Sequence, residues 1–129
     1  MLEVVAALII KDNKLMICQR PAFKSRPLLW EFPGGKVEEN ETKEQALKRE
    51  CKEELDILIE VRDLYAEVSY TYPDISINLS LFKASVKNGE PRLIEHNDLK
   101  WINLDQLDEF DFCPADKSII EKLKNETAL

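Results

Sequence analysis

The chain has 129 residues, of which 44% are hydrophobic and 33% are charged, and its formal net charge at pH 7 is −7. This length and composition are typical of one globular domain with its own hydrophobic core, so we expect a single domain over residues 1–129. The negative charge argues against a nucleic acid polymer as a partner, because phosphate backbones require a basic surface. A small phosphorylated substrate stays compatible with it, because a bound metal ion inverts the local field.

The cysteines and the first apolar run indicate where the protein works. Cys18, Cys51 and Cys113 are odd in number and lack a CxxC spacing, which is typical of free thiols in a reducing compartment. We therefore expect a cytoplasmic protein. Residues 4–10 are too few to span a membrane and follow Glu3 rather than a basic segment, so we expect neither a membrane contact nor a signal peptide.

In chain order, the first predicted elements are a hairpin, a loop and a helix. Residues 4–10 and 15–19 are apolar runs on either side of a polar tetrapeptide at 11–14, a pattern that predicts a β-hairpin. Residues 21–28 are polar and begin with a proline, which indicates a loop near the entrance of a site. Residues 42–55 predict an α-helix. Its apolar stripe, which recurs every four residues, consists of Leu47, Cys51 and Leu55.

The second half of the chain predicts two further strands, at 61–72 and 75–86, joined by a turn at Pro73-Asp74. In the later strand apolar and polar residues alternate, which is the period-two pattern of a half-buried strand. Asn88-Gly89 signals another turn. The remaining predicted elements are a short strand at 99–102, a helical turn at 105–107 and a last helix at 115–123. The last helix is expected to bury Ile119, Ile120 and Leu123.

One face of the predicted helix at 42–55 is unusually acidic. At about 100° per helical residue, Glu50, Glu53 and Glu54 fall within one third of its circumference. Like charges at these spacings repel each other by roughly a few tenths of a kcal/mol per pair. Carboxylates on one rigid face are also the ligands that hard divalent ions prefer. Taken alone, the acidity favours an ordinary solvated surface helix over a metal site.

The full spacing around this helix resembles the signature of the Nudix hydrolase superfamily, G-x5-E-x7-R-E-U-x-E-E-x-G-U, where U is a bulky apolar residue. The matching residues lie within 35–57 and are Gly35, Glu41, Arg49, Glu50, Cys51, Glu53, Glu54 and Ile57. One position departs, because Asp56 stands where the family has glycine. The helix ends there, and Asp tolerates the left-handed conformation of helix ends better than most residues. We therefore expect Asp56 to affect the helix exit rather than the metal ligands.

The resemblance extends over most of the chain. The sequence LWEFPGGKVE at 29–38 is similar to the MutT-like branch of the superfamily and equally to a related CTP pyrophosphohydrolase branch. Glu95 stands six residues before Trp101, as a further acid does in the MutT-like branch. Pro114-Ala115-Asp116 matches a segment that contacts the base there. The resemblance implies an α/β Nudix fold, in which a mixed β-sheet is sandwiched between α-helices.

The resemblance also implies a divalent metal cofactor, Mg²⁺, with Mn²⁺ as a substitute. The expected ligands are the carboxylates of Glu50, Glu53 and Glu54, with Glu95 as a further acid. Nudix enzymes often add a backbone carbonyl near the position of Gly35, which only a residue without a side chain presents at close approach.

Four side chains are assigned to catalysis and phosphate contact. Either Glu53 or Glu95 is expected to be the general base, and the residues alone leave both open. Arg49 is expected to orient the carboxylates by bidentate pairing. Arg20 matches an arginine that contacts phosphate in MutT-like enzymes, and the alternative is an ordinary edge-strand arginine. The resemblance gives His96 no catalytic role.

Base recognition is assigned to Trp30, Phe32 and Asp116, because a nucleobase needs an aromatic or apolar wall and a few placed polar groups. Trp30 and Phe32 flank Glu31, and we expect one ring on each face of the sheet. An ionised Asp116 only accepts hydrogen bonds, which suits the donor-rich edges of cytosine, guanine and oxidised guanine. The alternative is that Asp116 caps the last helix.

The activity that the resemblance implies is hydrolysis of a nucleoside triphosphate to a nucleoside monophosphate and diphosphate. The first choice is sanitising of the nucleotide pool by hydrolysis of 8-oxo-dGTP, and the alternative substrate is CTP, dCTP or 5-methyl-dCTP. A catalytically silent nucleotide-binding sensor is an alternative of another class, although no acid of the signature is missing. We expect a monomer or a homodimer.

Overall fold

Seven β-strands and two α-helices make up the architecture that a computed structural model describes over residues 1–129. The strands are β1 (Leu2–Lys11), β2 (Lys14–Gln19), β3 (Trp30–Glu31), β4 (Gly34–Lys36), β5 (Leu58–Thr71), β6 (Ser76–Asn88) and β7 (Asp98–Ile102). The helices are α1 (Lys43–Leu55) and α2 (Lys117–Lys124), with 3₁₀ turns η1 (Leu104–Glu109) and η2 (Pro114–Asp116) before α2. Neither α-helix has the length and apolarity that crossing a membrane would require.

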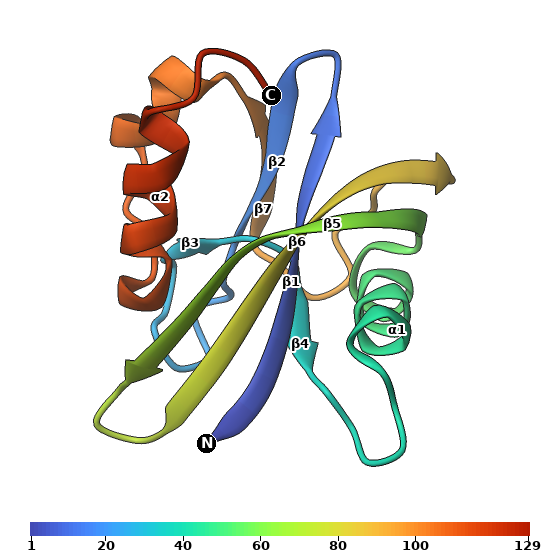
Figure 1. Ribbon diagram of the computed structural model, residues 1–129, viewed down its shortest axis with the longest axis vertical. Helices are drawn as coiled ribbons and strands as arrows, with labels where there is room; N and C mark the ends of the chain where they lie inside the picture. The colour runs from blue at the N-terminus through green and yellow to red at the C-terminus, as the bar shows by residue number, and fades with distance from the viewer.

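The strands form one mixed sheet in the order β3-β2-β1-β6-β5, with β4 paired to β1 and β7 paired to β2. β1 and β6 run parallel to each other, from Leu2 opposite Ile77 to Ile9 opposite Ala84. Figure 1 shows α1 and α2 on opposite sides of this sheet. The predicted sandwich of a mixed sheet between helices is therefore confirmed.

Each face of the sheet has its own hydrophobic core. The predicted stripe of α1 is completely buried on one face, against Val5 and Ile9 of β1. The predicted inward residues of α2 are buried on the other face, against Leu8 and Leu81. Since burying one such side chain contributes about 1.5–3 kcal/mol, these two cores hold both helices to the sheet.

The expected β-hairpin joins β1 and β2, and its turn explains why the chain reverses there. Asp12 and Asn13 have φ angles of 52° and 60°. Two consecutive positive φ values are typical of a type I′ turn, whose twist matches that of the flanking strands. The pairs Ile10–Leu15 and Lys11–Lys14 close the hairpin on either side.

Both ends of α1 are fixed by local contacts. Thr42 is the N-cap and forms a reciprocal capping box with Gln45. At the other end, Asp56 adopts the left-handed conformation, with φ 55° and ψ 41°, and its backbone N–H donates to the Lys52 carbonyl. The expectation for Asp56 is therefore confirmed. The Asp56 carboxylate also pairs with Lys52 Nζ at 2.6 Å.

The prediction that Trp30 and Phe32 lie on opposite faces of the sheet is wrong. β3 ends at Glu31, so Phe32 lies beyond the strand, and both rings belong to the core that faces α2. Trp30 packs edge-on against Phe110 with ring centroids 5.1 Å apart, and Phe32 stacks on Phe112 at 5.9 Å. Side chains two positions apart in an extended chain point to the same face, so a shared face is what period-two alternation predicts for residues 30 and 32.

Candidate active site

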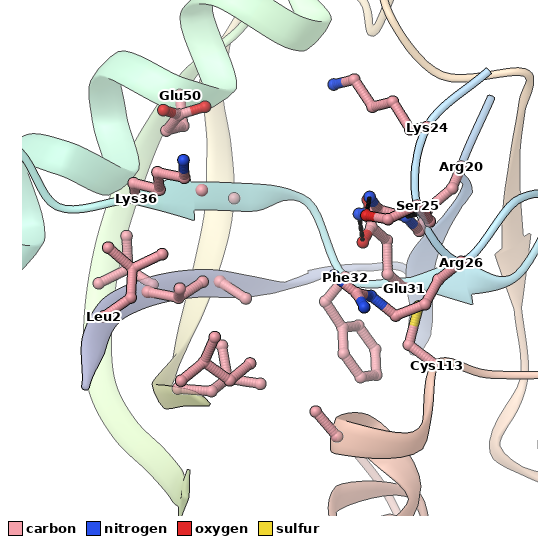
Figure 2. A pocket seen from close by; sticks show the side chains of 18 of the residues that line it. Leu2, Arg20, Lys24, Ser25, Arg26, Glu31, Phe32, Lys36, Glu50 and Cys113 are labelled. Carbon is pink, nitrogen blue, oxygen red and sulfur yellow. Dashed lines mark hydrogen bonds and ion pairs between the residues drawn. The ribbon is translucent and has the colours of Figure 1, made fainter. Parts of the chain in front are cut away.

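A cavity of about 620 Å³ extends from the acidic face of α1, across β1 and β6, to the segment before α2. This volume is typical of pockets for small ligands. Its floor is apolar and consists of Leu2, Val4, Ala6, Ile77 and Leu79. Figure 2 shows Glu50 and Lys36 at one end of the pocket and Arg20, Ser25 and Arg26 at the other.

One end of the cavity borders the acidic face of α1 and is called the acidic end below. Beside it, Arg49 neutralises the carboxylates of Glu41 and Glu50. Its Nε and Nη2 donate to the two oxygens of Glu41 at 2.7 and 3.0 Å, and this bidentate pair helps to lower the Glu41 pKa to about 2. Its Nη1 donates to Glu50 at 2.8 Å and lies 3.4 Å from Glu53. The bidentate partner of Arg49 is therefore Glu41, and a single N–H orients Glu50. Arg49 Nη2 also donates to the Lys36 carbonyl at 3.0 Å, which ties α1 to β4.

Glycine at position 35 makes room for Glu50. A Cβ atom built on Gly35 would lie 2.4 Å from Glu50 Cδ, which no real contact tolerates. The Glu50 carboxylate therefore rests directly against the β4 backbone. A side chain at position 35 would therefore displace the Glu50 carboxylate from this place.

Glu54 is a buried carboxyl whose ionised form is electrostatically disfavoured. Its side chain is 10% exposed, and Oε1 is buried without a hydrogen-bond partner. Burial raises the Glu54 pKa to about 9, and the charges of Glu50 and Glu31 act in the same direction. A cation beside Glu54 would reverse this penalty.

The acidic end fits a hard divalent ion by its chemistry. It offers carboxylate oxygens, an orphaned buried oxygen on Glu54 and a glycine cradle under Glu50. In the described conformation, no three carboxyl, imidazole or thiol groups lie close enough together to enclose an ion. Arg49 contacts one oxygen of Glu50 and one oxygen of Glu53, so the other oxygen of each carboxylate is left for an ion.

Glu53 and Glu95 both line the cavity, although they come from different elements. Glu53 lies on α1 with a side chain that is 58% exposed. Glu95 lies in the loop between β6 and β7 and pairs with Lys24 at 3.7 Å. The fold therefore brings both candidate bases to one cavity and leaves the choice between them open.

Glu31 and His96 are site residues that the sequence analysis missed. Glu31 accepts from Arg20 Nη1 at 2.9 Å and lies 3.3 Å from His96 Nε2. Burial raises the Glu31 pKa, but the hydrogen bonds and charges of His96 and Arg20 outweigh it and lower the pKa overall. The sequence did contain a signal for Glu31, which stands between two aromatic residues. A charged side chain in such a position needs a polar partner if it is buried.

Arg26, Tyr72 and Asp74 close the far end of the cavity and were also missed. The Arg26 guanidinium lies 3.9 Å from the centre of the Tyr72 ring, and its Nη1 donates to Asp74 at 3.0 Å. The Tyr72 hydroxyl accepts from the Ala115 backbone N–H at 2.8 Å. These contacts join the loop before β3, the β5–β6 turn and the segment before α2.

Asp116 lines the cavity and is 5% exposed. The helix-cap alternative is wrong, since Asp116 has helical φ and ψ and makes no capping hydrogen bond. Burial raises the Asp116 pKa well above its usual range, and the Glu31 charge adds to the effect. Burial therefore works against the ionised, purely accepting form that we expected of Asp116. A protonated carboxyl offers one donor as well as acceptors.

Of the two aromatic residues assigned to base recognition, Phe32 lines the cavity and Trp30 does not. Trp30 is instead covered by Phe110 in the core. Arg20 lies at the cavity end opposite Glu50, where the backbone carbonyl of Ser25 accepts from its Nε at 2.7 Å. The structure therefore places the predicted site residues around one cavity, with two exceptions. Trp30 lies in the core, and Arg49 does not line the cavity but contacts its residues Glu50 and Glu53.

Comparisons with known proteins agree with this geometry. A family model described as NUDIX domain matches residues 4–122. A CTP pyrophosphohydrolase of Escherichia coli K12 is 37% identical over 121 residues, which cover 94% of this chain and 90% of that protein. An 8-oxo-dGTP diphosphatase of the same organism is 37% identical over 114 residues, which cover 88% of each chain.

Solved structures show the same fold. The MutT protein of Methanosarcina mazei Go1 has a TM-score of 0.85 at 21% identity, covering 95% of this chain and 91% of that chain. The ORF135 protein of Escherichia coli has a TM-score of 0.77 at 36% identity, covering 94% and 86%.

Proposed function

This chain belongs to the NUDIX domain family of hydrolases, and we propose that it hydrolyses nucleoside triphosphates to nucleoside monophosphates and diphosphate. The observation that carries the proposal is the arrangement of the cavity. An acidic end, at which Glu54 Oε1 is buried without a partner, is continuous with an apolar floor and a second polar end at Arg20 and Asp116. A metal-bound polyphosphate fits between the acidic end and Arg20, and a nucleobase fits the apolar floor.

Mg²⁺ is the cofactor that we propose, with Mn²⁺ as a substitute. Glu50, Glu53 and Glu54, the carbonyl of Gly35 and the further acid Glu95 would hold it. When bound, the ion screens the phosphate charges and lowers the pKa of a bound water. The chain's own contribution is to hold the carboxylates on one rigid helix face, with the Glu50 carboxylate oriented by Arg49 at 2.8 Å.

Other residues around the cavity accept the proton, contact the phosphates and hold the base. Glu53 or Glu95 accepts the proton of the attacking water, since both line the cavity. Arg20 contacts the substrate phosphates, and Glu31 holds its guanidinium at 2.9 Å. Phe32 supplies the aromatic wall for the base, in contrast to Trp30, which the core covers.

Asp116 selects the base in this proposal. Its protonated carboxyl pairs with an edge that presents a donor next to an acceptor. Oxidised guanine offers N7–H beside O6, and cytosine offers its amino group beside N3. We propose 8-oxo-dGTP as the preferred substrate. CTP, dCTP or 5-methyl-dCTP is the second candidate, which the likeness to the CTP pyrophosphohydrolase favours.

A screen for diphosphate release tests the function. Normal, oxidised and methylated nucleoside triphosphates are incubated with the protein and Mg²⁺, and we expect a monophosphate and diphosphate without initial orthophosphate. In H₂¹⁸O, attack at the β-phosphorus places the label in diphosphate, whereas attack at the α-phosphorus places it in the monophosphate. Tight nucleotide binding without turnover under any divalent ion would instead support a sensor.

A further inference from the structure

His96 is the single histidine of the chain, and its ring is buried between two carboxylates. Its side chain is 4% exposed. Nε2 lies 3.3 Å from Glu31 Oε2 and 3.9 Å from Glu54 Oε1, whereas Nδ1 is buried without a hydrogen-bond partner. The two ring nitrogens therefore occupy opposite electrostatic environments.

This asymmetry determines which nitrogen of His96 carries a proton. A proton on Nδ1 would leave a buried donor without an acceptor, and the Nε2 lone pair would then face the Glu31 carboxylate at 3.3 Å. A proton on Nε2 avoids both penalties, because it donates to Glu31 and turns a positive edge toward Glu54. The conclusion holds for the neutral ring and for the imidazolium, since both carry hydrogen on Nε2.

Glu31 transmits this hydrogen bond to Arg20. One Glu31 oxygen lies beside His96 and the other accepts from Arg20 Nη1 at 2.9 Å. Ser25 holds the opposite edge of the same guanidinium, through its carbonyl at 2.7 Å and its hydroxyl at 3.2 Å. Figure 2 shows Arg20, Ser25 and Glu31 clustered at this end of the cavity.

The backbone around His96 is itself anchored. The next residue, Asn97, donates its backbone N–H to the Gln19 carbonyl at 2.9 Å and its side-chain amide to Gln19 Oε1 at 2.7 Å. Gln19 immediately precedes Arg20. The backbone next to the imidazole is therefore anchored to the end of β2, directly before Arg20.

We propose that His96 is a positioning residue for nucleotide binding, which orients Glu31 through its Nε2–H and thereby holds the Arg20 guanidinium toward the substrate phosphates. The inference rests on the proposed function only for the identity of the ligand. Without the imidazole donor, Glu31 would keep one partner and would face the carboxyl of Glu54 across the vacated space. Glu31 would then turn, and Arg20 would lose one of its two anchors.

A long-range ¹H–¹⁵N spectrum of labelled wild-type protein tests the first step without any variant. Because the chain has one histidine, the spectrum contains a single imidazole. We expect Nε2 to carry hydrogen, and we expect Glu31→Gln to shift its resonance. Hydrogen on Nδ1 alone, or a rapid average of the two tautomers, would overturn the proposal. This result does not depend on turnover, so it stands apart from the test of the proposed function.

Two variants test the effect on binding. His96→Gln keeps an N–H donor near the position of Nε2, whereas His96→Leu fills the space without one. With the best substrate of the screen, we expect His96→Leu to raise KM about tenfold and to change kcat less than about threefold, as loss of a binding contact does. We expect His96→Gln to restore most of the affinity.

A matched control separates the imidazole donor from general loosening of the loop. Asn97→Ala removes the neighbouring side-chain anchor to Gln19 but leaves His96 in place, and we expect a smaller rise in KM than for His96→Leu. The proposal fails if His96→Gln is as impaired as His96→Leu, or if kcat falls while KM is unchanged. A wild-type protein that hydrolyses no nucleoside triphosphate would instead overturn the proposed function.

Discussion

Replacing Glu54 by Gln should stabilise the metal-free protein while removing its activity. Glu54 is buried, lies near Glu50 and Glu31 and has a pKa raised to about 9. The amide has the same shape without the charge, so burial and repulsion no longer penalise it. We expect turnover with Mg²⁺ to fall at least ~10²-fold, because a proposed metal ligand is lost.

The size and sign of the stability effect follow from the raised Glu54 pKa. Above the unfolded pKa of about 4.3, the folded protein keeps a proton that the unfolded chain releases, so stability falls by up to about 1.4 kcal/mol per pH unit. The limit at pH 7 is about 4 kcal/mol. Sharing of charge with Glu50 and the hydrogen-bond needs of the new amide reduce the expected gain to about 1–3 kcal/mol.

Urea denaturation in EDTA at pH 5 and pH 8 measures this effect. We expect Glu54→Gln to be more stable than wild type at pH 8. At pH 5 we expect the two to differ by less than about 1 kcal/mol, because that pH is only slightly above the unfolded pKa of Glu54. Added Mg²⁺ should stabilise the wild type more than the variant. Glu53→Gln is the matched control, since its side chain is 58% exposed, and we expect its stability to change by less than about 0.5 kcal/mol. A variant less stable than wild type at pH 8 would refute the reasoning.

Three further substitutions test the site. Glu53→Gln should lower turnover at least ~10²-fold, and near wild-type activity at saturating Mg²⁺ would contradict its assignment. Gly35→Ala should displace the Glu50 carboxylate, because the new Cβ would lie 2.4 Å from Cδ, and turnover should fall without a comparable rise in KM. Asp116→Ala should reduce kcat/KM for the preferred base by about 1–3 kcal/mol in free energy. Thymidine triphosphate should lose little in the same assay, and an equal loss for all bases would remove Asp116 from base selection.

Local sequence signals predicted the elements that local contacts determine. The helix at 42–55 was predicted nearly to its ends, because Thr42 supplies a capping box and Asp56 tolerates the left-handed exit. The hairpin at 11–14 was also predicted from local signals, since Asp12 and Asn13 both accept positive φ. In these places each residue's own conformational preference agrees with the fold.

The elements that were not predicted depend on partners far away in the sequence. β3 and β4 have two and three residues, and they are strands only because they pair with β2 and β1. Glu31 and His96 meet across 65 positions, and neither belongs to a periodic pattern. Trp30 was wrongly assigned to base recognition because the residue that covers it, Phe110, is also far away in the sequence. Short elements and buried polar pairs are properties of the assembled sheet.

The charges of the site are divided between two arginines, and this division explains where a cation belongs. Arg49 neutralises Glu41 and Glu50 on the outer side of α1, and Arg20 neutralises Glu31 at the other end of the cavity. Glu54 lies between these two groups and has no basic side chain of its own apart from the edge of the His96 ring, so its carboxyl is destabilised by burial. The fold therefore concentrates uncompensated negative potential at one buried carboxyl, which lowers stability in the absence of a cation and favours binding of one. We expect the free energy of unfolding to rise when Mg²⁺ is added and to fall as the pH is raised in EDTA. Both measurements report the same uncompensated charge of Glu54.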